Sequence, residues 1–512
     1  MLTPHSLGLH KILSLLSPLV RPVVNWNAER RLANAVNVSD IRDCAKQRAH
    51  KMVFDYLDSG ADDEVTLRRN KDAFVDLEFH YKVLAGLKPP LDLSTRVLGN
   101  DVEVPFFPSP TAGSKMFHAD GEIGVARAAK KVGAMYCLST MGTTSPLDLA
   151  ASLGTDSSDL SATPQPPKRL FQLYVWRDRS LVRDLLAQAK ESGFTSLALT
   201  ADLTWYGNRE MDTRNGFTVP PSYSSSQVLQ ALKKPAWSWD FLANDEYAYA
   251  ALDVAVRARQ ERAAACSLGN TSTRNHPEAE EPLPTDRRVQ VSFIRDAFDP
   301  SFNWNDAEWL CDEWGSVGPV ALKGVVRPDD ASRAVASGFD AVWVSNHGGR
   351  QLEGAVAPID VLPSIRGAMG GTEAWCAAKN VADSVRKGGG GDAEIATAVA
   401  QRVPDMKTSL RTGLPVEIIL DGGITRGTDI VKALVLGADA VGLGKPFLFG
   451  LCAGGETGVR KVFEILREET ERAMGLLGAG SVQDLREANS GKREDEKFVR
   501  RRSTGRGRDF RV

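Results

Sequence analysis

The chain has 512 residues, of which 42% are hydrophobic and 25% are charged, and this ordinary globular composition excludes wholesale disorder. Its 63 Lys and Arg residues nearly balance 65 Asp and Glu residues, so a protein that works mainly by coating nucleic acid is excluded. We therefore expect no nucleic-acid partner. No transmembrane segment is expected, because no apolar run reaches about 20 residues, and no metal is expected, because Cys and His lack the spacing of a zinc site.

Residues 1–36 are predicted to be an N-terminal extension of the folded domain. They contain no Asp or Glu before Glu29, and five apolar residues between positions 9 and 16 could share one helical face. This pattern is similar to that of a mitochondrial targeting leader, and a leader without fixed structure is the alternative. The expected location of the protein is mitochondrial or cytoplasmic.

Residues 37–489 are predicted to form one α/β domain. Eight short apolar runs alternate with amphipathic helical segments, and each run is continuous, as expected of strands buried on both faces of a parallel sheet. This order predicts a (β/α)8 TIM barrel; an open doubly wound sheet is the alternative, but no G-x-G-x-x-G motif follows the early strands. The predicted strands are residues 105–110, 134–140, 169–175, 195–202, 319–325, 341–347, 416–423 and 440–446, and the predicted helices include 121–132, 180–192, 327–337 and 428–436.

Three insertions are predicted to interrupt the barrel. They are a Ser- and Pro-rich loop at 154–167, a long excursion at 221–295 with a helix over 246–265, and a loop at 367–413 centred on a run of four glycines. Such loops are often lids over a barrel's catalytic face, and a variable insertion without a role is the alternative. The Arg-rich segment 490–512 is predicted to be a flexible tail.

Polar residues gather at the carboxyl ends of the predicted strands, where the chemistry of a TIM barrel takes place. Because burying unpaired charge costs free energy, so many polar groups at one rim favour a ligand site. These residues include Pro110, Thr111, Ala112, Ser139, Gln172, Tyr174, Thr200, Asp202, Lys323, Ser345, His347, Asp421, Gly444 and Lys445.

The segment from Ser345 to Arg350 carries a base and a guanidinium separated by two glycines. Arg350 suits a carboxylate, and His347 could take a proton from the adjacent carbon or hydroxyl while Asp202 orients its imidazole. Asp421, with the two glycines that follow it, and Lys445 fit a phosphate site after the last two strands. On these residues alone, isomerase, lyase and oxidoreductase all stay open.

At these positions the chain resembles the FMN-dependent L-2-hydroxy acid oxidases and dehydrogenases, which include glycolate oxidase and the cytochrome- or quinone-linked L-lactate dehydrogenases. The resemblance runs from about residue 40 to residue 485. Its motifs are Tyr56-x-x-Ser-Gly-Ala-Asp-Asp, Pro110-Thr-Ala112, Phe171-Gln-Leu-Tyr-Val175, Leu199-Thr-x-Asp202, Leu322-Lys-Gly324, Ser345-Asn-His-Gly-Gly-Arg-Gln-Leu352 and Asp421-Gly-Gly-Ile-Thr-Arg-Gly-Thr-Asp429.

The resemblance implies FMN as cofactor, an L-2-hydroxy acid as substrate, and a cytochrome, a quinone or oxygen as electron acceptor. It also implies a homo-oligomer, as a tetramer. The residues implied to bind FMN are Pro110, Thr111 and Ala112 beside the ring; Ser139, Gln172, Thr200 and Lys323 on its polar edge; Ser345 on the ribityl chain; and Asp421, Gly422, Gly423, Arg426, Gly444 and Lys445 around the phosphate. The residues implied to handle the substrate are Tyr56, Arg350 and Arg209 at its carboxylate, Tyr174 at its hydroxyl, and His347, backed by Asp202, as base.

Three departures from the family pattern bear on affinity and substrate. Thr425 stands where the family usually has the first of two arginines, and Lys445 stands where it usually has arginine, so FMN binding is expected to be retained but weakened. Met141 replaces a tryptophan that is frequent in members acting on glycolate. We therefore expect oxidation of L-lactate, with a peroxide-producing glycolate-type oxidase as the first alternative. A phosphate-binding barrel isomerase and a non-catalytic flavin-binding protein are the others.

Overall fold

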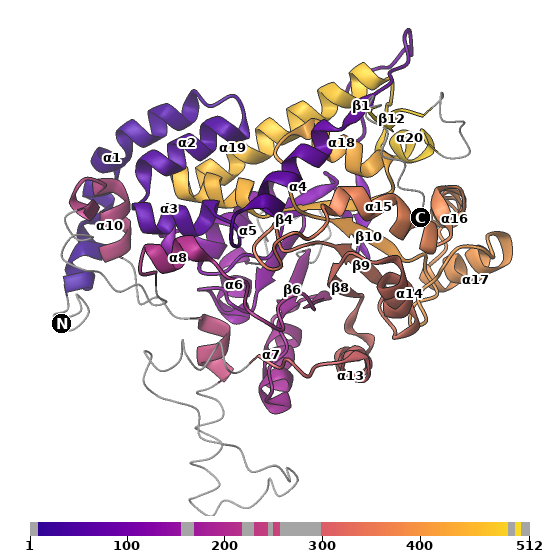
Figure 1. Cartoon of the computed structure of the whole chain (residues 1–512), viewed down its shortest axis with the longest axis horizontal. Coiled ribbons are helices and arrows are strands. Elements are labelled where there is room, and N and C mark those ends of the chain that lie inside the picture. The colour runs from indigo at the N-terminus through magenta and orange to yellow at the C-terminus, as the bar shows by residue number, and fades with distance from the viewer. Residues whose placement is uncertain are drawn as a thin grey trace, which may run out of the picture.

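The structure, a computed structural model, describes residues 9–154, 168–217, 230–243, 249–255, 298–489 and 497–502. Its centre is a sheet of eight parallel strands surrounded by helices (Figure 1). All eight predicted strands are confirmed, each slightly shorter than the apolar run that predicted it. They are β4 (Phe106–Pro108), β5 (Tyr136–Ser139), β6 (Arg169–Leu173), β7 (Ser196–Thr200), β8 (Val320–Val325), β9 (Ala341–Val344), β10 (Glu417–Leu420) and β11 (Ala440–Leu443).

The strands are hydrogen-bonded in the order β4-β11-β10-β9-β8-β7-β6-β5, and all of these pairings are parallel. The two outer strands of this order, β4 and β5, also lie side by side, so the sheet nearly closes into a ring. The predicted TIM barrel is therefore confirmed. In this arrangement the carboxyl ends of all eight strands meet at one rim.

Side chains that alternate along the strands fill the inside of the barrel. Phe107 and Trp343 lie in this inner cluster, and their rings meet edge to face with centroids 5.5 Å apart. Small residues such as Ala198 and Ala321 on neighbouring strands leave room for these rings. The barrel is thus a packed core rather than a pore.

A hairpin closes the amino-terminal end of the barrel. It consists of β2 (Thr95–Val97) and β3 (Asn100–Val102), which pair in antiparallel fashion. Val97, Leu98 and Val102 belong to the same buried cluster as the inner strand residues. The opposite rim, at the carboxyl ends of the strands, is left for ligand binding.

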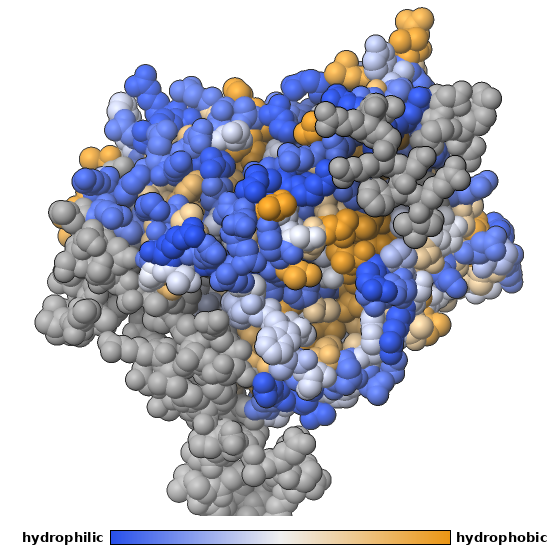
Figure 2. Space-filling view, viewed as in Figure 1, coloured by the Kyte–Doolittle hydropathy of each residue, from blue (hydrophilic) through white to orange (hydrophobic). Residues whose placement is uncertain are grey.

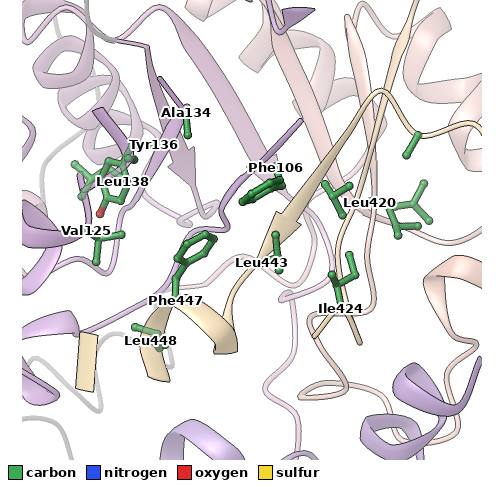
Figure 3. Close-up of a cluster of buried hydrophobic side chains, with 14 of the residues drawn as sticks. Phe106, Val125, Ala134, Tyr136, Leu138, Leu420, Ile424, Leu443, Phe447 and Leu448 are labelled. Atoms are coloured by element: carbon green, nitrogen blue, oxygen red, sulfur yellow. The ribbon is translucent and has the colours of Figure 1, made fainter. Parts of the chain in front are cut away.

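The outer faces of the strands pack against helices. Figure 3 shows part of this layer, in which Phe106 of β4 and Leu443 of β11 lie near Phe447. The four helices named from sequence are confirmed as α5 (Gly121–Lys131), α7 (Arg179–Glu191), α14 (Pro328–Ala336) and α18 (Gly427–Val435). The remaining helices around the barrel include α6 (Pro146–Leu153), α8 (Glu210–Arg214), α13 (Trp304–Trp314), α15 (Pro358–Ala368), α19 (Lys445–Leu477) and α20 (Val482–Glu487), with the short η2 (Ser114–Met116) and η3 (Gly315–Val317).

Four helices precede the barrel, namely α1 (Leu9–Ala33), α2 (Val38–Arg48), α3 (Lys51–Asp58) and α4 (Val65–Val75). The α1 helix packs against α2, α19 and α10 (Pro235–Ala243), the last of which belongs to the long excursion. Ala28 and Leu32 are the buried residues on its inner side. In the described part of the chain, no helix combines the length and the apolar character needed to cross a membrane.

The insertion at 367–413 is not the loop that its glycines suggested. It forms two helices, α16 (Gly371–Lys387) and α17 (Asp392–Arg402), which pack against each other around a small apolar cluster that includes Trp375 and Ile395. Glycines 388–391 only connect the two helices. A helix-period apolar pattern on both sides of the glycines carried the correct signal.

The other predicted insertions and the tail are described only in part. Of the excursion, α10 and a helical segment at 250–255 are described, and most of the loop at 154–167 lies outside the described residues. The tail prediction is wrong for β12 (Val499–Arg501), which pairs antiparallel with β1 (Leu77–Phe79). An edge pairing between distant segments leaves no periodic signal in an Arg-rich sequence.

Candidate active site

A row of polar side chains follows the carboxyl rim of the barrel. On one side, Ser139 Oγ donates to Gln172 Oε1 at 3.0 Å, and Gln172 Nε2 donates to Thr200 Oγ1 at 2.8 Å. These three residues end β5, lie on β6 and end β7, so consecutive strands supply consecutive members of the row. All three are buried. The rim therefore presents a buried line of hydrogen-bonding groups above an apolar core.

The row continues across β8, β9 and β10. Lys323 Nζ donates to Ser345 Oγ at 2.9 Å and lies 3.3 Å from Asp421 Oδ2. Burial disfavours the charged amine, but the nearby Asp421 and Asp202 carboxylates outweigh burial and raise the pKa of Lys323 above its ordinary value. A permanent positive charge thus sits in a low-dielectric rim, where it acts strongly on any ligand that develops negative charge.

His347 and Asp202 form a close pair beside this row. The distance between His347 Nδ1 and Asp202 Oδ1 is 2.8 Å. Burial is the largest influence on His347 and lowers its pKa below the ordinary value, against the raising effect of Asp202. Burial also disfavours the Asp202 carboxylate, but His347 and Lys323 outweigh it, so the pKa of Asp202 is lowered. At neutral pH the pair is a neutral imidazole and a carboxylate.

The backbone at His347 is constrained. Its φ of 57° lies in the left-handed region, which His tolerates better than most residues and which often marks a functional position. Two side chains for which the sequence analysis predicted no role hold this loop. Gln351 Nε2 donates to the carbonyls of Asp202 and Trp205 at 3.0 Å each, and Asn346 exchanges hydrogen bonds with Asn70 of α4.

Two guanidinium groups converge on Tyr56, which lies on α3. Arg350 Cζ is 4.8 Å from the centre of the Tyr56 ring, and Arg209 Cζ is 6.0 Å from it. Arg350 also donates to the carbonyl of Tyr56 at 2.6 Å. Burial, with the positive charge of Arg209 next, lowers the pKa of Arg350 to about 10. Two neighbouring cations in a buried site can act as a receptor for a carboxylate.

An aromatic wall borders this receptor. Phe298 stacks on Trp176 with centroids 4.9 Å apart and meets Tyr174 edge to face at 5.5 Å. Tyr206 lies 5.9 Å from the same Phe298 ring. Phe298 follows the long excursion in sequence, so this insertion ends at the site. No role was predicted for Phe298 or Trp176, because ring contacts between distant loops leave no local pattern in the sequence.

The residues predicted around the phosphate are only partly brought together. Gly422 and Gly423 have φ of 98° and 86°, and a Cβ on Gly423 would lie 2.0 Å from the carbonyl of Asn70, so packing against α4 already requires glycine there. Lys445 Nζ donates to the carbonyls of Asp58 and Ser59 at 2.7 and 3.0 Å. Arg426 instead pairs with Glu469 of α19 at 3.1 Å, so its phosphate contact stays a prediction.

Glu122 of α5 joins the loops after β4 and β5. Its buried carboxylate accepts hydrogen bonds from the backbone of Ser114 and Thr143, at 3.1 and 2.8 Å, and from the hydroxyls of Thr143 and Thr144. These loops carry Pro110, Thr111, Ala112 and Met141. An acidic residue in the first turn of a helix is too common for the sequence to single out Glu122.

The rim of this (β/α)8 barrel brings together a His–Asp pair, a buried lysine and two arginines. Such a set of groups is typical of the active site of an enzyme. The family described as FMN-dependent dehydrogenase matches residues 45–491, and the chain belongs to this family. An L-lactate oxidase of Nostoc sp. is 33% identical over 454 residues, covering 89% of this chain and 97% of that protein. Glycolate oxidase 1 of Oryza sativa subsp. indica is 33% identical over 458 residues, with coverage of 90% and 96%.

Solved structures agree with this assignment. The crystal structure of the monotopic membrane protein (S)-mandelate dehydrogenase matches with a TM-score of 0.68 at 30% identity, and the match covers 91% of this chain and 100% of that one. The protein is therefore an FMN-dependent oxidoreductase that oxidises a 2-hydroxy acid.

The rim has the chemistry that FMN needs. Its buried row alternates donors and acceptors, as the polar edge of a flavin ring requires. Among the described residues, Asp421 Oδ1 is buried without a hydrogen-bond partner. A Cβ on Gly444 would meet nothing closer than Thr111 Cγ2 at 3.9 Å, so the backbone there is open to a ligand. The residues present fit the cofactor.

Proposed function

We propose that the protein oxidises L-lactate to the 2-oxo acid and passes the electrons to an acceptor other than oxygen, a cytochrome or a quinone. The observation that carries the catalytic part is the His347–Asp202 pair at 2.8 Å beside the two guanidiniums over Tyr56. A base next to a carboxylate receptor suits a substrate in which the reacting carbon bears the carboxylate. FMN, when bound, supplies the two-electron acceptor at the rim.

The receptor residues have separate tasks in this proposal. Arg350 and Arg209 bind the substrate carboxylate, which relieves the repulsion between the two cations in the free enzyme. Tyr56, which lies on α3, contacts the carboxylate on one side. The Tyr174 hydroxyl donates a hydrogen bond to the substrate hydroxyl. Burial, with Asp202 next, raises the pKa of Tyr174, so it stays a donor at all working pH values.

The proton goes to Nε2 of His347. Because Asp202 accepts the hydrogen bond from Nδ1–H, the neutral imidazole has its lone pair on Nε2. The imidazolium that forms is stabilised by the same carboxylate. Lys323, Ser139, Gln172 and Thr200 are proposed to hold the polar edge of the flavin, and Lys323 offsets negative charge that develops there.

The size of the proposed substrate is inferred from the side chain at position 141, which is Met141. Its flexible side chain takes the position where relatives specific for glycolate often carry a larger, rigid tryptophan, which leaves room for the methyl group of lactate. Relatives that match over most of the chain carry the names L-lactate oxidase and glycolate oxidase 1, so the glycolate-type oxidase that produces peroxide is the second candidate. A tetramer and a mitochondrial or cytoplasmic location belong to the same proposal, which a native mass measurement and cell fractionation test.

Turnover on glycolate, L-lactate and L-mandelate, each with oxygen and then with an artificial acceptor, tests the proposal. We expect the highest kcat/KM for L-lactate and faster turnover with the artificial acceptor. Preference for glycolate with stoichiometric peroxide would favour the second candidate. Anaerobic L-lactate should bleach the flavin absorbance; a flavin that keeps its colour with all three acids would favour an isomerase.

Replacing Asp202 with Asn is expected to lower kcat/KM and to move the acid limb of its pH profile to lower pH. Burial lowers the pKa of His347 and Asp202 raises it, so removing the carboxylate lowers that pKa further. The imidazolium formed during proton transfer also loses its partner, and a fall of roughly 10²–10⁴-fold in kcat/KM follows. A pH series of kcat/KM on both proteins measures the shift; an acid limb that moves to higher pH would contradict it.

Replacing Lys445 with Met is expected to weaken FMN binding by roughly tenfold or more, because charge-assisted hydrogen bonds contribute about 1.5–3 kcal/mol. Quenching of flavin fluorescence on titration into apoprotein measures the dissociation constant. Lys432→Met is the matched control, since Lys432 also donates to a backbone carbonyl, that of Phe74, but lies on α18 away from the rim row. Equal FMN affinity in both variants would remove Lys445 from the phosphate site.

A further inference from the structure

The α1 helix carries a row of exposed apolar side chains on the face turned away from the protein. Leu19, Val23 and Trp26 are 74%, 76% and 59% exposed, and Leu16 is 43% exposed. Their spacing of three and four residues places all four within one narrow stripe of a helix with 3.6 residues per turn. In Figure 2, hydrophobic residues interrupt the hydrophilic surface at the left edge, where Figure 1 shows α1.

The stripe is separate from the packing face of the helix. Ala28 and Leu32, which are buried against the protein, lie on the opposite side of α1 by helical geometry. The outward residues therefore do not support the packing of α1 on α10 and α19. Four large apolar side chains in one exposed row are unusual for a surface helix and mark an interaction site.

Charge and size indicate what covers the stripe. Two exposed basic residues, Arg30 and Arg31, lie in the last turn of the helix at the end of the stripe, against the single acidic residue Glu29. The Arg30 guanidinium lies 5.9 Å from the centre of the Trp26 ring, so an aromatic residue and a cation end the stripe together. Trp and Arg side chains of this kind are enriched where an apolar surface meets lipid head groups.

A second copy of the chain fits the stripe less well. A stable protein interface takes about 800 Å² from each partner. One row of four partly covered side chains offers less than this area. A helix that lies in the membrane plane needs only an apolar face a few ångströms deep and an excess of positive charge.

We propose that α1 docks the folded enzyme on an anionic lipid surface, with Leu16, Leu19, Val23 and Trp26 inserted among the acyl chains and the exposed Arg30 and Arg31 at the head groups. This surface is distinct from the rim of the barrel. The proposal concerns attachment of the whole molecule and holds whichever 2-hydroxy acid is the substrate.

Co-sedimentation of the full-length holoenzyme with vesicles tests the proposal. The vesicles contain phosphatidylcholine alone or phosphatidylcholine mixed with phosphatidylglycerol. We expect binding to the anionic vesicles that weakens as salt is added, and little binding to phosphatidylcholine alone. The double variant Leu19→Glu/Val23→Glu should lower the partition coefficient about tenfold or more, because it removes apolar burial and adds negative charge.

Leu410→Glu is the matched control, because Leu410 is 70% exposed in the turn between α17 and β10, two elements that Figure 1 shows on the other side of the molecule from α1. Its vesicle binding should equal that of the parent protein. Flavin content and turnover in solution should be the same in all three proteins, which shows that the variants are folded. Failure of the parent protein to bind, or equal binding by the double variant, would overturn the proposal. A double variant whose mass in solution is half that of the parent would also overturn it, since a second copy of the chain would then cover the stripe.

Discussion

Replacing His347 with Gln is expected to lower turnover by roughly 10²–10⁴-fold while the protein still binds flavin. His347 Nε2 is the proposed proton acceptor, and the Gln amide has no basic nitrogen. The change does not touch Ser139, Gln172 and Lys323, which are proposed to hold the flavin. Anaerobic stopped-flow measurement of flavin bleaching by L-lactate isolates the step, because it does not depend on the electron acceptor.

A second variant and a control make this result specific. His347→Asn suits the left-handed backbone at φ 57° better than Gln, so loss of activity in both variants excludes backbone strain as the cause. His118→Gln is the matched control: His118 is also buried, and its Nε2 lies 3.4 Å from Asp240, but it is outside the rim row. Its bleaching rate per bound flavin should stay close to that of the parent protein. Bleaching by His347→Gln at the parent rate would remove His347 as the base.

The barrel could be predicted because buried parallel strands leave a continuous apolar signal. Each of the eight runs, from Phe106 to Leu443, became a strand, and the helices between them were shifted by only one residue or so. All of the strands except β8 are shorter than predicted at their carboxyl ends, where residues such as Asp202 and His347 leave the ladder to face the rim. Active-site residues of TIM barrels lie at the carboxyl ends of the strands, so these ends were already the predicted location of the site.

The features that were predicted wrongly or not predicted at all have physical causes of a different kind. The glycines at 388–391 outweighed the helical pattern of Trp375 and Ile395 on either side, so two helices were taken for a loop. The β12 strand depends on a partner more than 400 residues away in the chain. Glu122 and Gln351 act through backbone groups of distant loops, and a backbone carbonyl or N–H is the same in every residue. Such contacts exist only once the chain is folded.

Replacing Arg350 with Met is expected to lower kcat/KM by roughly 100-fold or more, mainly through a higher KM, because the substrate carboxylate loses the two charge-assisted hydrogen bonds proposed for Arg350. Arg350→Lys should recover only part of this loss, since an ammonium lacks the fork that matches a carboxylate. Arg69→Met serves as control, because Arg69 pairs with Asp76 and Asp360 on the protein surface, and its KM should be unchanged.

The same receptor predicts an alkaline limit for substrate binding. Burial, with Arg209 next, lowers the pKa of Arg350 to about 10, so the guanidinium begins to lose its charge as pH rises towards that value, and KM should rise with it. In Arg209→Met the lowering influence of Arg209 is absent. The pKa of Arg350 then increases, and the alkaline rise in KM should move to higher pH, although KM at neutral pH is larger because one cation is gone. Steady-state KM for L-lactate across the alkaline range measures both effects. A rise that moves to lower pH in Arg209→Met would show that the two guanidiniums do not share one carboxylate receptor.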